Sequence, residues 1–209
     1  MSRPSKRATG SSHLRSSPAH SDSVYLAGPE VFLFNAREIL DLKIALTREA
    51  GLVPISPGDL ELPKTDSKWE LGLAISAIDE KLMNSAGAII ANLTPFRGLA
   101  ADTGTCFELG YMCAQGKPAF AYSNVKADHG ERTRQHFGGA FDIDARGLPR
   151  GPDGMLIDDM GFVDNLMLHG GVLNRGGSVV VGDAAPGQEL TDMTAFKAVL
   201  RIAAQKLST

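Results

Sequence analysis

The sequence predicts an α/β fold in which a parallel sheet is flanked by helices. Short apolar segments typical of strands alternate along the chain with longer segments of helical spacing, and this alternation indicates βαβ units and a parallel sheet. Four such units fall within about 100 residues, which fits a small doubly wound sheet of the flavodoxin-like kind. The length of 209 residues suits one domain with a sizeable core, which we place at residues 23–209.

Turn residues and helical spacing delimit the elements of the first half. The predicted elements are a strand at 24–27, a helix at 35–49, a strand at 52–55, a loop at 56–67 and a helix at 69–85. The first strand ends at Gly28-Pro29. The first helix has apolar residues three or four positions apart and ends at Gly51, because glycine commonly closes a helix.

The second half contains one long irregular stretch. The predicted elements are a strand at 88–93, a loop at 94–101, a helix that contains Glu108, a strand at 118–122, an apolar segment at 162–168 and an amphipathic helix at 191–207. Residues 124–161 carry many Gly, Asp and Arg residues and predict no regular element. A structureless loop of this length is unusual in a compact domain, so we expect it to be functional or partly disordered.

Composition and charge argue against several classes of protein. Residues 1–22 are rich in Ser, Arg, Pro and His and lack an apolar core, so we expect a disordered extension rather than a signal peptide. The net charge is −3 and the folded part has no basic stripe, which argues against a nucleic-acid polymer as partner. No apolar run approaches the ~20 residues that span a bilayer, so no membrane partner is expected.

Cysteine usage indicates a reducing compartment. The chain has 2 cysteines, Cys106 and Cys113, on one predicted helix. They would lie roughly 10 Å apart, which is too far for a disulfide. Their spacing also matches no zinc site, so we expect a cytoplasmic protein in which both are small buried hydrophobic residues.

The most informative segment is 102–110, which places Asp102 and Glu108 where a predicted strand turns into a helix. Ligands of open α/β sheets bind at the carboxyl ends of the strands. The side chain of Glu108 would lean over Gly104 and Thr105, whose small size leaves the carboxylate open. A glutamate in this position can attack an electrophile, and we expect the helix N-terminus to favour its anion.

Other candidate residues meet at the same edge of the predicted sheet. Tyr25 and Gly28-Pro29 end the first strand, and Asp79 lies on the helix before the third. The 5 histidines are scattered, and no phosphate-binding or dinucleotide-binding glycine motif is present. Paired carboxylates without a metal suggest glycosidic-bond chemistry, in which one carboxylate attacks or stabilises the reacting carbon and another acid protonates the leaving group.

Each candidate residue also has a purely structural explanation. Asp102 suits a helix N-cap, and Glu108 or Asp79 would be solvated if its helix face were exposed. Tyr25 would serve equally as a core aromatic with a satisfied hydroxyl. Gly28-Pro29 would serve as a turn without any ligand.

Together these segments resemble the nucleoside 2-deoxyribosyltransferase family. The matching stretches are 25–32, Asp79 through 93, 96–111, 116–118 and 165–167, and the match covers most of residues 24–170. The resemblance implies the flavodoxin-like fold, 2′-deoxynucleosides and free nucleobases as substrates, and neither metal nor organic cofactor. Residues 1–22 have no clear counterpart, and the stretch after Gly170 matches poorly.

The resemblance also implies a role for each catalytic residue. Glu108 attacks C1′ of the deoxynucleoside, and a second base displaces the covalent deoxyribosyl-enzyme with net retention. Tyr25 orients this nucleophile, and Asp79 faces the base and helps to protonate it. Asp102 contacts a substrate hydroxyl or the base.

Further substrate-binding residues follow from the same resemblance. Gly28, Pro29 and Phe32 lie in the matching stretch at the end of the first strand. Asn165 and Met167 match residues that a neighbouring subunit contributes to the sugar site. A homo-oligomer with shared active sites is therefore expected.

Two other functions compete with the transferase. One is a hydrolase that cleaves the N-glycosidic bond of a deoxynucleoside or a nucleoside 5′-monophosphate, with water as acceptor. Asp102 argues against the monophosphate, because its charge would repel a phosphate group. The other is a non-catalytic nucleotide-sensing module, which would bind a ligand without turnover.

Overall fold

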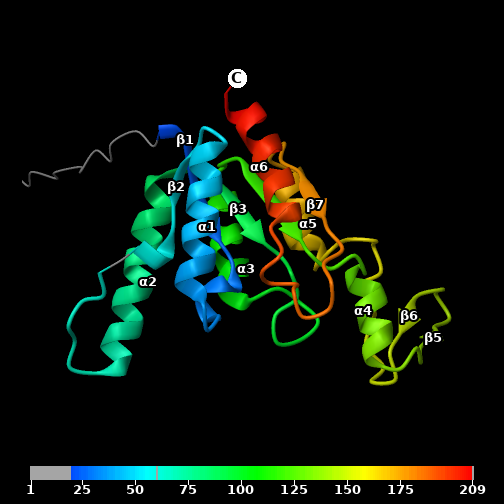
Figure 1. Cartoon of the computed structure of the whole chain (residues 1–209). Coiled ribbons are helices and arrows are strands. Elements are labelled where there is room, and N and C mark those ends of the chain that lie inside the picture. Colours follow the sequence, from blue (N-terminus) through cyan, green and yellow to red (C-terminus); the bar gives the residue numbers. More distant parts are fainter. Residues whose placement is uncertain (1–19, 60, 209) are drawn as a thin grey trace, which may run out of the picture.

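A mostly parallel, twisted sheet forms the centre of the molecule and has helices on both faces (Figure 1). The computed structural model describes residues 20–59 and 61–208. In this part the main sheet has 5 strands in the order β2-β1-β3-β4-β7. The strands are β1 (His20–Ala27), β2 (Val53–Ile55), β3 (Ala86–Asn92), β4 (Ala119–Ser123) and β7 (Val179–Val181). All of their pairings are parallel, which confirms the predicted doubly wound, flavodoxin-like fold.

The helices divide between the two faces of the sheet. They are α1 (Ala36–Glu49), α2 (Lys68–Ser85), α3 (Thr103–Ala114), α4 (His129–His136), α5 (Leu166–Leu173) and α6 (Thr194–Leu207), with short 3-10 helices η1 (Pro29–Phe32) and η2 (Pro57–Asp59). Helices α1 and α6 supply side chains to the core on one face, whereas α2, α3 and α5 supply them on the other. The sheet therefore separates two hydrophobic cores.

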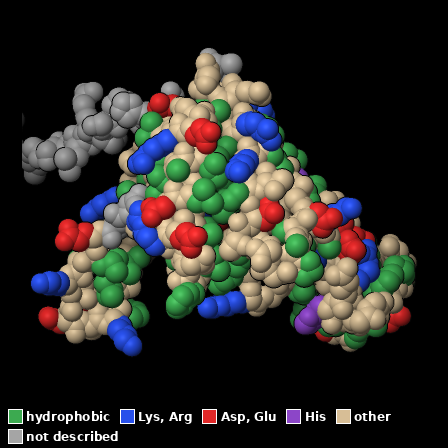
Figure 2. All heavy atoms as spheres, viewed as in Figure 1, with side chains coloured by type: hydrophobic (Ala, Val, Ile, Leu, Met, Phe, Trp, Pro, Cys, Tyr) green, Lys and Arg blue, Asp and Glu red, His purple; other side chains and the backbone are tan. Residues whose placement is uncertain are grey.

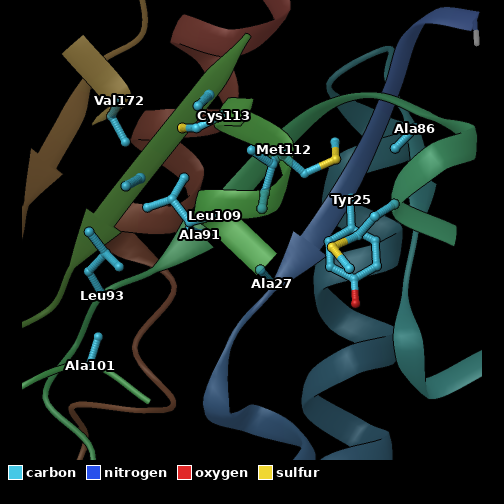
Figure 3. Close-up of a cluster of buried hydrophobic side chains, with 14 of the residues drawn as sticks. Tyr25, Ala27, Ala86, Ala91, Leu93, Ala101, Leu109, Met112, Cys113 and Val172 are labelled. Carbon is cyan, nitrogen blue, oxygen red and sulfur yellow. The ribbon is translucent and has the colours of Figure 1, made fainter. Parts of the chain in front are cut away.

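Alternation along β1 decides which side chains reach which core. Val24 and Leu26 pack on the face of α1 and α6. Tyr25 and Ala27 point to the opposite face, toward α2 and α3, because successive side chains of a strand alternate. Figure 3 shows Tyr25 among the apolar side chains of this second core, with Leu109 and Met112 of α3 nearby. The residue expected to orient the nucleophile is thus on the face that carries Glu108.

The N-terminal boundary differs from the predicted one. Strand β1 begins at His20, so residues 20–22 of the segment expected to be disordered belong to the sheet. Residues 1–19 lie outside the described part of the chain. Residues 20–23 are all polar, which explains why the apolar pattern placed the start of the strand at Val24.

The stretch 124–161 is not the structureless loop that its composition suggested. It contains α4 and a small hairpin of β5 (Asp142–Ile143) and β6 (Pro149–Arg150). Helix α4 escaped prediction because its residues are polar and lack an apolar period. Its N-terminus is capped instead by Asp128, whose Oδ1 accepts a hydrogen bond from the backbone N–H of Glu131 at 2.7 Å.

The last third of the chain holds two further differences. The apolar segment predicted at 162–168 contributes the first turn of α5, which continues to Leu173. Strand β7 was not predicted, because 3 residues give too little pattern. The closing helix is present, and Phe196, Val199 and Leu200 are buried as its amphipathic spacing predicted. No helix in the described residues combines the length and apolar character that crossing a bilayer requires.

Candidate active site

A hydrogen bond between Tyr25 and Glu108 stands at the centre of the candidate site. The Tyr25 hydroxyl donates to Oε1 of Glu108 over 2.6 Å, although the two residues lie 83 positions apart in the chain. A distance this short is typical of a hydroxyl bound to a carboxylate. The Tyr25 ring is anchored in the core, and its hydroxyl oxygen lies at the edge of the apolar cluster (Figure 3). The fold therefore fixes one oxygen of the glutamate.

A cavity of about 500 Å³ opens at the carboxyl ends of the strands, in front of Glu108. Its lining includes five of the residues predicted from the sequence, namely Gly28, Phe32, Asp79, Asp102 and Glu108. A cavity of this size accommodates a small organic molecule. The structure thus brings together residues of the segment after β1, of α2 and of the start of α3, which are distant in the sequence.

The N-terminus of α3 is built so that Asp102 serves as cap and also faces the cavity. Its Oδ2 accepts hydrogen bonds from the backbone N–H of Thr105 at 2.9 Å and from the Thr105 hydroxyl at 3.2 Å. A β-carbon at Gly104 would lie 3.0 Å from the same oxygen. Any larger residue at this position would therefore crowd the Asp102 carboxylate. The structural explanation of Asp102 is correct, and it is compatible with a ligand role because the residue also lines the cavity.

Burial dominates the electrostatics of Glu108. It raises the pKa of the Glu108 carboxyl to about 7, while the hydrogen bond from Tyr25 acts in the opposite direction. The same net value includes smaller contributions from the nearby carboxylates of Asp79 and Asp102, which act to raise the pKa, and from the Lys43 ammonium, which acts to lower it. Tyr25 itself remains protonated, because burial and the charge of Glu108 raise its pKa.

The expectation that the helix dipole favours the Glu108 anion was wrong. Helix α3 begins at Thr103, so Glu108 lies more than one turn inside it. The dipole acts mainly within the first turn, and desolvation outweighs it at this depth. The anion must instead be supported by specific partners.

Asp79 has the properties of a group that can hold a proton. It lies on α2, and burial raises the pKa of its carboxyl. Its Oδ1 is buried and has no hydrogen-bond partner among the described residues. An unpaired buried oxygen is costly unless a ligand or water satisfies it, so this atom is available to a substrate.

A second, smaller cavity meets the first at the two acids. It has a volume of about 260 Å³, and Asp79, Glu108, Ile75 and Gly104 line both cavities. Phe107 lines only the smaller one. The two acids therefore stand between two compartments.

Four predicted residues are not part of the lining of the main cavity, and one of them, Tyr25, reaches the site through its hydrogen bond to Glu108. Pro29 is buried at the start of η1 and is not part of the lining. Asn165 caps α5 through a bond from the backbone N–H of Met167 to its Oδ1, 3.0 Å long. Asn165 is exposed and Met167 is 72% exposed, and neither lines the cavity. Their expected role in a neighbouring subunit's site is compatible with this exposure.

The sequence did not single out part of the lining of the main cavity. Pro57, Gly58 and Leu62 line it from the Pro/Gly-rich segment after β2. That segment follows a strand directly, which was the available signal. Phe32, which also lines this cavity, is stacked on Phe96 with 5.3 Å between ring centroids, and this contact helps to hold its ring in place.

A buried arginine ties the loop before α3 to the start of α5. Arg132 of α4 donates to the carbonyl oxygens of Leu99 at 3.0 Å and Val163 at 2.7 Å. Its guanidinium lies 3.6 Å from Oδ2 of Asp164, which in turn accepts the backbone N–H of Ala101 at 2.8 Å. These bonds fix the backbone immediately before the α3 cap. The described residues contain no group of three or more His, Cys, Asp or Glu that could hold a metal.

Comparison with known families and proteins identifies relatives of this chain. Residues 24–167 match the family described as nucleoside 2-deoxyribosyltransferase. An uncharacterised protein of Schizosaccharomyces pombe is 32% identical over 197 residues, a match that covers 89% of this chain and 90% of that protein. The family match spans every residue that lines the main cavity, from Gly28 to Glu108.

Solved structures share the fold. A 2-desoxiribosyltransferase from Leishmania mexicana superimposes with a TM-score of 0.60 at 26% identity, covering 88% of this chain and 97% of that one. A conserved protein from Enterococcus faecalis V583 has a TM-score of 0.53 at 14% identity, over 86% of this chain and 97% of its own. The second likeness concerns the fold alone.

Proposed function

Because the chain belongs to the nucleoside 2-deoxyribosyltransferase family, we propose that it transfers 2-deoxyribose from a 2′-deoxynucleoside to a free nucleobase. Family membership makes it an enzyme that transfers or hydrolyses a glycosyl group. One observation carries the finer proposal. The Glu108 carboxylate is held by Tyr25 over 2.6 Å and faces a cavity that Asp79 also lines.

In the first step, Glu108 acts as the nucleophile. Its carboxylate forms a bond to C1′ while the bond between C1′ and the base nitrogen breaks, and the electron pair of that bond passes to the base. Asp79 supplies a proton to the departing base. Its raised pKa keeps the carboxyl protonated to a higher pH than that of an ordinary aspartate. Tyr25 occupies Oε1, which leaves the second oxygen to attack.

In the second step, an incoming base displaces the glutamate. Its nitrogen bonds to C1′, the ester bond to Glu108 breaks, and the carboxylate is restored. The proton released by the incoming base returns to Asp79. Two inversions at C1′ give net retention, and the two compartments beside Glu108 and Asp79 provide room for the exchange.

The residues that line the main cavity support the proposed substrate class. Among the residues that line it, Phe32 offers an aromatic surface, and Asp79, Asp102 and Glu108 offer carboxyl groups. An aromatic surface stacks a nucleobase, and carboxylates accept hydrogen bonds from sugar hydroxyls. Gly28 lets the backbone approach a ligand closely.

We also propose that the active enzyme is a homo-oligomer in which Asn165 and Met167 complete the site of a neighbouring subunit. Both are exposed and lie away from the cavity of their own chain. Helix α2 exposes Trp69 and Leu73, at 77% and 57%, and Figure 2 shows a hydrophobic patch over this helix. Exposed apolar patches often mark association surfaces. The free cysteines of the described chain support a cytoplasmic location.

The test of the function is a base-exchange assay. The full chain is incubated with deoxyinosine and free adenine, and the products are separated by chromatography. Hypoxanthine together with deoxyadenosine is the expected result. Parallel mixtures with thymidine and cytosine cover a preference for pyrimidines. Hypoxanthine with free 2-deoxyribose and no new nucleoside would reject transfer and establish the hydrolase, whereas ligand binding without turnover would establish a sensor.

The covalent intermediate has its own test. Intact-protein mass spectrometry of enzyme mixed with a deoxynucleoside, without acceptor base, should show a mass increase of one deoxyribosyl group. The variant Glu108→Gln serves as control and should show none. An adduct that persists in Glu108→Gln would assign the nucleophile to another residue.

A further inference from the structure

The aromatic side chain that lines the main cavity is in contact with two residues of the loop before α3. Phe32 lines the cavity, and its ring is stacked on that of Phe96 with 5.3 Å between centroids and 20° between planes. The guanidinium carbon of Arg97 lies 5.7 Å from the centroid of Phe32 and 4.9 Å from that of Phe96. Phe96 and Arg97 are not part of the lining, so Phe32 is the member of the group that meets a ligand.

The three groups form a triangle. Their separations of 5.3, 5.7 and 4.9 Å are similar, so the guanidinium lies beside both rings at once and not at the end of a linear stack. A cation within about 6 Å of an aromatic centroid is attracted by the charge distribution of the ring. The Phe32 ring is therefore held from two directions, and it still reaches the cavity.

The backbone holds Arg97 in an unusual conformation. Its φ of 52° lies in the left-handed region, where it is the one non-glycine residue of the described part of the chain. The backbone N–H of Phe96 donates to the carbonyl oxygen of Ala100 over 2.9 Å, which closes the loop around Arg97. The neighbouring Gly98 would adopt this conformation freely but does not occupy it. A residue with a β-carbon that is kept in this region points to a function.

Stability does not explain why an arginine occupies this position. Arg97 is exposed, and within residues 20–59 and 61–208 its guanidinium has contacts with the two rings but no hydrogen bond or ion pair. The attraction between an exposed cation and an aromatic ring is no larger than the cost of the left-handed backbone, so together they add little to stability. The contacts do restrict Phe32, which is 56% exposed and would otherwise be free to rotate.

The loop that carries Phe96 and Arg97 is itself anchored. The Arg132 guanidinium donates to the carbonyl oxygen of Leu99 at 3.0 Å. The backbone N–H of Ala101 donates to a carboxylate oxygen of Asp164 at 2.8 Å. Both bonds lie just after Arg97 in the chain. The two residues that contact Phe32 are therefore supported by a fixed backbone.

We propose that Arg97 and Phe96 are positioning residues that hold the Phe32 ring as a preformed platform for the base of the substrate. This rests on the proposed function, in which that ring stacks the base. An exposed side chain that a ligand must first order weakens binding, because its rotational freedom is lost on association. A ring held by Phe96 and Arg97 has lost this freedom beforehand. The departing and the incoming base use the same ring in turn, so the effect applies to both.

The experiment compares variants that separate the guanidinium from the backbone. Arg97→Asn removes the guanidinium, and asparagine tolerates the left-handed conformation better than most residues with a β-carbon. Arg97→Gly also relaxes the backbone, so a loss shared by both variants is due to the guanidinium. Arg97→Lys keeps a cation and should recover part of the effect. Phe96→Leu removes the stacked ring, and Arg48→Gln, at an exposed position in the last turn of α1, controls for loss of a surface arginine.

The first measurement needs neither ligand nor turnover. The full chain is labelled with para-fluorophenylalanine, and the ¹⁹F signal of Phe32 is assigned by its absence in Phe32→Leu. Transverse relaxation of this signal should become slower in Arg97→Asn, Arg97→Gly and Phe96→Leu, because the ring gains mobility. It should be unchanged in Arg48→Gln. The loss of a nearby charge would alter the chemical shift alone, so unchanged relaxation in Arg97→Asn would overturn the proposal.

The second measurement is the kinetics of base exchange. KM should rise about 3- to 10-fold for both the deoxynucleoside and the acceptor base in Arg97→Asn, with little of the loss in kcat, because the ring does not touch the reacting atoms. Arg97→Lys should lie between this variant and the wild type. An unchanged KM beside a more mobile ring would overturn the role in binding. A raised KM beside an unchanged ring would mean that Arg97 contacts the substrate itself, which also contradicts the proposal.

The two measurements separate this proposal from the proposed function. If the wild type exchanges no base, the proposed function fails. The relaxation of the Phe32 signal still decides whether Arg97 and Phe96 hold the ring. If the wild type exchanges bases and Arg97→Asn matches it in both measurements, the positioning role fails and the proposed function stands.

Discussion

At the scale of single residues, opposing effects act on the protonation of Glu108. The cavity wall desolvates its carboxylate, and this favours the protonated form, whereas the Tyr25 hydroxyl and the Lys43 ammonium favour the anion. A nucleophile benefits from this compromise, since a poorly solvated carboxylate is more reactive than one surrounded by water. The desolvated carboxylate makes the folded protein less stable once Glu108 ionises, and this loss of stability can be measured.

We predict that Glu108→Gln makes the protein more stable at pH 8 than the wild type. The folded-state pKa of about 7 is above the ordinary value of 4.5, so the folded state holds the proton more tightly than the unfolded state. The stability linked to this proton is complete below about pH 4.5 and is lost as the pH rises through 7. Glutamine does not titrate and avoids the loss, which we put on the order of 2 kcal/mol because the side chain is only partly buried.

Thermal unfolding measured at pH 5 and pH 8 checks this prediction. The gain in Tm of Glu108→Gln should be several degrees at pH 8 and distinctly smaller at pH 5. Glu49→Gln, at an exposed position near the end of α1, should show no such dependence. An equal gain at both pH values would mean that the effect of the substitution is steric. Base exchange should fall by about three orders of magnitude or more in the same variant.

We predict that Tyr25→Phe slows the reaction and moves its pH dependence. In the wild type, kcat/KM should rise with pH through about 7, because the free enzyme must lose the Glu108 proton before attack. The Tyr25 hydrogen bond stabilises the charged form, so its removal raises the pKa of Glu108. The acidic limb should therefore shift to higher pH, and kcat should fall by roughly 10- to 100-fold. A loss of kcat with an unmoved limb would restrict Tyr25 to holding the geometry.

At the scale of elements, α3 shows how one residue can serve both a helix and a cavity. Asp102 accepts the backbone N–H of Thr105 and also lines the main cavity. The loop before it is fixed by Asp164 and Arg132, which come from much later in the chain. The first turn of α3 is thereby held from both sides, and the nucleophile one turn further along inherits this rigidity.

We predict that two substitutions separate the roles of Asp102. Asp102→Asn keeps a capping oxygen, so its Tm should remain close to that of the wild type, whereas Asp102→Ala should lose about 1 kcal/mol of stability. If the carboxylate contacts the substrate, both variants should raise KM. Thermal unfolding and steady-state kinetics on the same preparations check both parts. A KM that rises in Asp102→Ala alone would show that Asp102 acts only through the helix cap.

At the scale of the whole molecule, the sequence predicted the helices and strands that have a clear hydrophobic pattern. It missed the elements that form through individual tertiary contacts. Apolar alternation and helical spacing located four strands of the sheet and the helices α1, α2, α3 and α6. Strand β7 was too short and α4 too polar to give a pattern. Their formation depends on tertiary contacts, such as the Arg132 bonds, that a single sequence does not reveal.

The candidate site divides in the same way. Glu108, Asp79 and Asp102 were recognisable because acids recur at the carboxyl edge of the predicted sheet, and the structure places them around one cavity. The buried ion pair of Glu30 and Lys43, which lies outside the cavity lining, gave no signal in the sequence, because charged residues are rarely buried. Whether Asn165 and Met167 complete a site depends on a second subunit, which neither sequence pattern nor a single chain contains.

Complementation between two inactive variants tests this shared site. Glu108→Ala lacks the nucleophile, and Asn165→Ala lacks a residue expected to act in the neighbouring subunit; each should be nearly inactive alone. In a mixed dimer, one site combines the intact Glu108 of one chain with the intact Asn165 of the other. Random assembly after co-expression should therefore restore roughly a quarter of wild-type sites. If Asn165 acted within its own chain, the mixture would show only the summed activity of the two variants. Co-expression with a doubly substituted chain controls for changes in assembly, because such oligomers contain no complete site.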